Sequence, residues 1–90
     1  MAHVQHDRKK LRARVRRIAG QVAALEKALD AGTDCADLLV QIAAARGPMH
    51  ALMMEVMAGH LREHVAGEAS ASRRAAEAEI LVGLLRGYAK

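Results

Sequence analysis

The chain has no phenylalanine or tryptophan, and only one tyrosine, one proline and one cysteine among its 90 residues. A single cysteine excludes an internal disulfide and is typical of proteins in the reducing cytoplasm. No apolar run approaches the roughly 18 residues of a membrane-spanning helix, and no apolar stretch of the secretory kind follows the charged N-terminus. We therefore expect a cytoplasmic protein with no membrane partner.

The apolar 52% of the sequence consists mainly of Ala, Leu, Val and Met, which favour closely packed helices. This composition predicts an all-α fold, and the length predicts a single domain over residues 1–90. Apolar positions spaced by threes and fours predict a first helix of about six turns that ends at Ala31-Gly32. These positions are Leu11, Val15, Ile18, Val22, Leu25 and Leu29.

Two further helices are predicted from the same periodicity. The second runs from about Cys35 to about Val65 and bends at Gly47-Pro48, because the proline removes one backbone hydrogen bond. Three amphipathic helices leave more apolar surface than a monomer can bury, so we expect the long middle helix to form a dimer. The third helix, from about Ser72, is predicted to face inward with Ile80, Leu81, Leu84, Leu85 and Tyr88.

Basic residues are concentrated near the N-terminus. Residues 7–17 hold seven Arg and Lys against one Asp, so this segment carries +6 and the rest of the chain −2. A basic segment on a nearly neutral body predicts a polyanionic partner, although a solvated helix face has the same pattern.

Two histidines lie four residues apart in His60-Leu61-Arg62-Glu63-His64, the spacing by which one helix face presents two imidazoles to a metal ion. The same spacing also occurs on solvent-exposed faces that bind nothing. The letters match the H-x-x-E-H pattern of one class of zinc peptidases. Three helices leave little room for the further ligand, substrate walls and closed cleft of such an enzyme, so we expect no enzymatic activity.

Cys35 is another candidate ligand, the alternative being a small buried apolar residue. On one helix Cys35 and His60 lie about 37 Å apart, at about 1.5 Å per residue, so one copy cannot bring both to one ion. Two antiparallel copies can, and they would cross between Pro48 and Met49. The sequence therefore predicts two symmetric intersubunit metal sites in each dimer.

The N-terminus offers additional ligands. After removal of Met1, His3 would be the second residue, able to chelate a metal together with the amine of Ala2. The alternative is that His3 and His6 are disordered. His50, near the expected helix crossing, is predicted to be a packing residue.

The sequences RRIAGQV at 16–22 and QIAAARG at 41–47, with Cys35 and HLREH at 60–64, resemble the CsoR/RcnR/FrmR family of transcriptional repressors over nearly all of the chain. The resemblance implies a three-helix protomer and an antiparallel dimer that pairs into a tetramer. It also implies operator binding that weakens when the effector binds, which switches on efflux or detoxification genes.

Within that family the ligand positions separate the branches. Copper sensors carry a thiolate where this chain has His64, and persulfide sensors need two cysteines. Formaldehyde sensors resemble the chain at Cys35 and His60, but typically have Pro after Met1 and Glu in place of His64. The set His3, Cys35, His60 and His64, with the N-terminal amine, is similar to that of the nickel and cobalt sensors. One sulfur with several nitrogens suits Ni(II) or Co(II), and also binds Zn(II) or Cu(II).

The resemblance also implies DNA contacts, mainly to phosphates, with specificity arising from DNA shape. The implied residues are Arg14, Arg17, Arg46 and Lys90. Pro48 and His50 depart from the family, which more usually has Ala and Asn there. Two alternatives remain: a formaldehyde-responsive repressor in which Cys35 reacts with the N-terminal amine, and a helical metal carrier with no DNA role.

Overall fold

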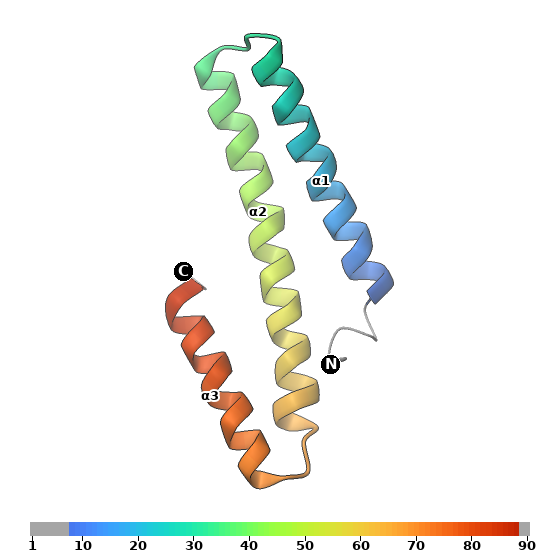
Figure 1. The fold of residues 1–90 in the computed structure, drawn as a ribbon, viewed down its shortest axis with the longest axis vertical. Helices are drawn as coiled ribbons and strands as arrows, with labels where there is room; N and C mark the ends of the chain where they lie inside the picture. Colours follow the sequence, from blue (N-terminus) through green and yellow to red (C-terminus); the bar gives the residue numbers. More distant parts are fainter. Residues whose placement is uncertain (1–7, 89–90) are drawn as a thin grey trace. The chain divides into compact units, whose positions relative to one another are not determined.

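The computed structural model describes residues 8–88, which contain three α-helices, one π-helical turn and no β-strand (Figure 1). The elements are α1 (Arg8–Asp30), α2 (Cys35–His60), the π-helical turn η1 (Leu61–Ala66) and α3 (Ala71–Tyr88). The all-α prediction is confirmed. The predicted second helix matches α2 and η1 taken together, but its last six residues are π-helical. Pro48 lies inside α2 without breaking it.

The turn between α1 and α2 follows from two local signals. Gly32 has φ +71°, a left-handed conformation that glycine adopts without steric cost. The N–H of Thr33 donates to Ala28 O over 3.0 Å and that of Gly32 to Leu29 O over 3.2 Å, which together make a Schellman motif. Asp34 then caps α2, because its Oδ2 accepts from the N–H of Ala36 over 3.1 Å.

The described residues form two compact units that share α2. Residues 9–52 form one unit, in which α1 runs antiparallel to the first part of α2 (Figure 1). The other unit includes residues 53–88, in which the end of α2 and η1 run antiparallel to α3. That residues 1–90 act as one domain stays a prediction.

The core of this chain is thin. Its buried large apolar side chains within residues 8–88 are Ile18, Met57 and Leu81, one from each α-helix. Each helix has one antiparallel neighbour within a unit, which covers one side of it. No helix within residues 8–88 is both long and apolar enough to span a membrane.

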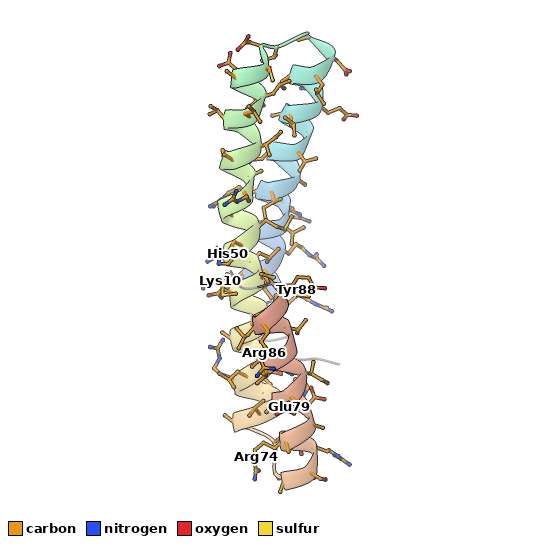
Figure 2. All side chains as sticks on the ribbon, turned by 90° about the vertical axis from the view of Figure 1, so that its left-hand side faces the viewer. Lys10, His50, Arg74, Glu79, Arg86 and Tyr88 are labelled. Carbon is orange, nitrogen blue, oxygen red and sulfur yellow. The ribbon has the colours of Figure 1, made fainter. Side chains whose placement is uncertain are left out.

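The expected inward faces of α1 and α3 are only partly buried. On α1, Val15, Val22 and Leu29 are exposed. On α3 Leu81 is buried as predicted, and the other four positions are exposed in the single chain, because no second helix within residues 8–88 covers them. Those four are Ile80, Leu84, Leu85 and Tyr88, the last of which projects from the end of α3 (Figure 2).

The exposed apolar side chains generate a prediction about assembly. Leu39, Ile42 and Met49 of α2 repeat by threes and sevens on one face and are 61%, 48% and 51% exposed. Apolar surface of this extent marks an interface, so we expect light scattering at micromolar concentration to give about four chains per particle. Ile42→Glu should reduce that mass, because it places a charge in the stripe.

Val40→Glu is the matched control, because Val40 is 68% exposed on the same helix but faces a different direction. This variant should keep at least the dimer. A monomeric parent protein, or equal dissociation by both variants, would contradict the interface on the Leu39–Met49 face.

Candidate functional site

The two candidate histidines lie together where α2 passes into the π-helical turn. His60 is the last residue of α2 and His64 lies in η1, with ring centroids 5.0 Å apart and ring planes inclined by 38°. Both residues are half-buried. Pairing of His60 and His64 on one helix face was predicted, and the π-helical geometry that relates them was not.

A close backbone approach ends the π-helical turn at Gly67. Its N–H donates to Arg62 O over 2.9 Å, a bond that spans five residues and is therefore of the π type. A Cβ at position 67 would lie 2.9 Å from that same oxygen and 3.2 Å from Glu63 O. Glycine is thus required by space, and π-helical turns of this kind are frequent at functional sites.

Glu77 of α3 contacts His60 of the histidine pair, and sequence reasoning missed it. Its Oε1 lies 2.9 Å from Nε2 of His60, whose side chain is 15% exposed. At this ion-pair distance a carboxylate helps to orient the imidazole. No motif marks Glu77 among the acids of this region, because its partner is set by how α3 packs on η1.

The loop between η1 and α3 determines that packing. Ser70 caps α3 by accepting from the N–H of Arg73 over 3.3 Å, and its own N–H donates to Oε2 of Glu68 over 3.0 Å. Arg74 donates from Nη1 to Glu68 O over 2.9 Å. These bonds fix where α3 begins. They therefore help to decide which residues of α3, Glu77 among them, lie against the histidine pair.

Cys35 is the first residue of α2 and is exposed, so its reading as a buried apolar residue is wrong. It belongs to the unit of residues 9–52, whereas His60 and His64 belong to the other. Within residues 8–88 no three side chains of His, Cys, Asp or Glu are grouped so as to bind a metal ion. The predicted ligands His3 and Ala2 lie outside the described residues.

The basic residues of α1 are mostly on its surface. Its first turn contains Arg8, Lys9 and Lys10 and no acid, although the positive end of a helix dipole favours acids. Helix stability therefore does not explain this placement. The exposed basic residues of α1 before its midpoint are Arg8, Lys9, Lys10, Arg12, Arg16 and Arg17.

The predicted DNA contacts differ in exposure. Arg17 and Arg46 are exposed, and Lys90 lies outside the described residues. Arg14 is half-buried, and its Nε is buried without a hydrogen-bond partner among residues 8–88. Arg14 therefore lies at the edge of the α1 face that turns inward.

The sequence pattern of the metal-sensitive transcriptional repressors matches residues 7–86. The chain belongs to this family. It is 43% identical over the full length of both chains to the transcriptional repressor RcnR of Salmonella typhimurium. It is also 50% identical, again over both full lengths, to an uncharacterised protein of the bioA 5′ region of Serratia marcescens.

A solved structure is similar to this chain over most of its length. It is a variant, with a glutamate replaced by histidine, of the formaldehyde-responsive regulator FrmR of Salmonella enterica serovar Typhimurium. The TM-score is 0.83 at 46% identity, covering 92% of this chain and 94% of the other. The family consists of transcriptional repressors, which confirms that the H-x-x-E-H letters do not mark a peptidase.

The His60–Glu77 contact predicts an effect on metal affinity. Glu77→Ala removes the carboxylate that orients His60, and loss of such a partner typically weakens metal binding by about tenfold or more. A Co(II) titration followed by absorption should show this loss. Glu79→Ala is the control, because Glu79 is exposed two residues further along α3 (Figure 2). Equal affinities in the two variants would contradict a role for Glu77.

Proposed function

We propose that this chain is a repressor that binds operator DNA in the metal-free form and releases it when Ni(II) or Co(II) binds. The observation that carries the proposal is the half-buried His60–His64 pair, with Glu77 in contact with His60, in a chain of the metal-sensitive repressor family. Release would derepress genes for metal efflux. The similarity to RcnR over the full length supports this reading.

The metal site is proposed to form between two subunits. Cys35 begins α2 and His60 ends it, so about 37 Å of helix separates them at about 1.5 Å per residue. In an antiparallel dimer through α2, Cys35 of one copy would meet His60 and His64 of the other. The exposed face of Leu39, Ile42 and Met49 supplies apolar surface for that dimer. Two dimers would then pair into a tetramer, as in our sequence-based expectation.

The donor set favours late first-row metals. One thiolate with the imidazoles of His3, His60 and His64 and the N-terminal amine suits Ni(II) and Co(II), while Zn(II) and Cu(II) are further possible binders. Glu77 on Nε2 of His60 would direct the metal to Nδ1 of that ring. The metal would link the two subunits, and the protein's own residues would hold and orient it.

A formaldehyde-responsive repressor is the second candidate, favoured by the exposed Cys35 and by the similarity to FrmR. In that case Cys35 would react together with the N-terminal amine. His64 is the imidazole that distinguishes the two, because formaldehyde sensors typically have Glu there. The third reading, a metal carrier with no DNA role, does not account for the basic surface of α1.

Operator DNA is the proposed polyanion for α1. Arg14 and Arg17 of α1, with Arg46 of α2 and Lys90, would make mostly phosphate contacts, and shape would select the sequence. Each phosphate contact that is lost should remove about one unit from the salt slope of log K. A gel shift on the DNA upstream of the protein's own gene tests the repressor reading directly.

Arg17→Ala should weaken operator binding and flatten the salt slope by about one unit, because Arg17 is exposed on the basic helix. Arg14→Ala should do the same. Both variants should retain metal affinity. Arg73→Ala, which removes an exposed arginine of α3, is the charge-matched control. If all three variants bind operator like the parent, the basic face of α1 is only solvated surface.

The ligands should separate into those that hold the metal and those that couple it to DNA. Cys35→Ala should abolish the near-ultraviolet thiolate-to-metal band and tight Ni(II) or Co(II) binding, and His64→Ala should weaken binding strongly. His3→Ala should retain measurable binding but leave DNA partly occupied at saturating metal, because His3 would join the metal to the basic helix.

Full metal-driven release by His3→Ala would show that the N-terminus takes no part. Release by formaldehyde and not by metal would favour the second candidate.

A further inference from the structure

Pro48 interrupts the hydrogen-bond ladder of α2. In an α-helix the N–H of residue 48 would donate to the carbonyl of residue 44. Proline has no N–H, and its ring presses against that same carbonyl, so Ala44 O loses its ordinary donor. The helix nevertheless continues from Cys35 to His60.

Gln21 of α1 supplies a donor to this carbonyl. Its Nε2 lies 3.3 Å from Ala44 O, in a hydrogen bond that joins the two helices of the 9–52 unit. Because a carbonyl oxygen only accepts, the acceptor itself fixes which end of the Gln21 amide points to it. Gln21 thus donates to the α2 carbonyl that lacks its helical N–H donor because of Pro48.

Packing directly beside this bond is sparse, although Ile18, one turn earlier on α1, is buried. Gln21, Ala24, Gln41 and Ala44 line a hollow of about 260 Å³. Alanine side chains on both helices provide no interdigitation that would resist sliding. A directional bond across such a hollow therefore has a disproportionate effect on where α1 lies along α2.

The bond acts on the face of α1 that carries Arg14. Arg14 and Gln21 are seven positions apart, about two helical turns, and both are half-buried. Movement of Gln21 relative to α2 would therefore move Arg14, and with it the exposed Arg17 on the next face of the helix.

We propose that Gln21, Ala44 and Pro48 form a cross-helix latch that fixes the register of the basic helix α1 on α2 and so sets the affinity for operator DNA. Gln21 is a positioning residue in this arrangement. The inference rests on the proposed repressor function for its DNA part only. An alanine at position 48 would return the helical donor to Ala44 O and make the Gln21 bond dispensable.

The test compares four proteins: the parent, Gln21→Met, Pro48→Ala and the double variant. Methionine keeps the length and helix propensity of glutamine and removes the donor. Gln21→Met should weaken binding of the metal-free protein to DNA upstream of its own gene by about fivefold, the equilibrium effect of one ordinary hydrogen bond. In the Pro48→Ala background the same change should cost less than twofold, which a merely structural role of Gln21 would not produce.

Gln41→Met is the matched control, because Gln41 lines the same hollow and makes no side-chain hydrogen bond within residues 8–88. It should leave operator affinity unchanged. Equal losses for Gln21→Met in both backgrounds, or no loss in the parent background, would overturn the latch.

Urea unfolding of the same four proteins at one concentration tests the latch without DNA. Gln21→Met should lower the unfolding midpoint more in the parent than in Pro48→Ala. A parent that binds no DNA from its own promoter overturns the proposed function and the role in operator affinity. The unfolding comparison still decides whether the latch exists, so the two failures are distinguishable.

Discussion

The rest of this protein depends on one constraint, which is that within a unit each helix is covered on one side only by another helix. Each helix packs against one antiparallel neighbour within a unit, and only Ile18, Met57 and Leu81 among the large apolar side chains of residues 8–88 are buried. Such a chain cannot obtain its stability from a thick core. In the proposed antiparallel dimer, assembly and metal binding are parts of one problem, because a second copy would both cover the apolar faces and bring Cys35 to the histidine pair.

Helix α2 carries the consequences of that constraint. It begins at the candidate thiolate, ends at the candidate imidazoles and belongs to both units. The proposed site therefore requires α2 to continue through Pro48. The proline leaves Ala44 O without its helical donor, and Gln21 of the basic helix donates to this oxygen. In the proposed latch, a residue that weakens the helix internally would strengthen its attachment to α1.

The helices were predicted well from the sequence, because apolar residues three and four positions apart are a local feature. The sequence also identified the His60–His64 pair, which depends on a few neighbouring residues. Glu77 was missed because its contact depends on how α3 packs on η1. The π-helical turn was missed because the spacing of apolar residues does not distinguish a π-helical turn from an α-helical one. The exposure of Ile80 and Leu84 was missed because periodicity shows which face is apolar, but not whether a neighbour covers it.

The basic first turn of α1 has a thermodynamic consequence of its own. Arg8 and Lys9 stand at the positive end of the helix dipole, so charge repulsion opposes helix formation there. A bound polyanion removes that repulsion, and binding and helix formation then reinforce each other. A polyanion bound at this end should therefore shift the equilibrium of the first turn of α1 toward the helical state.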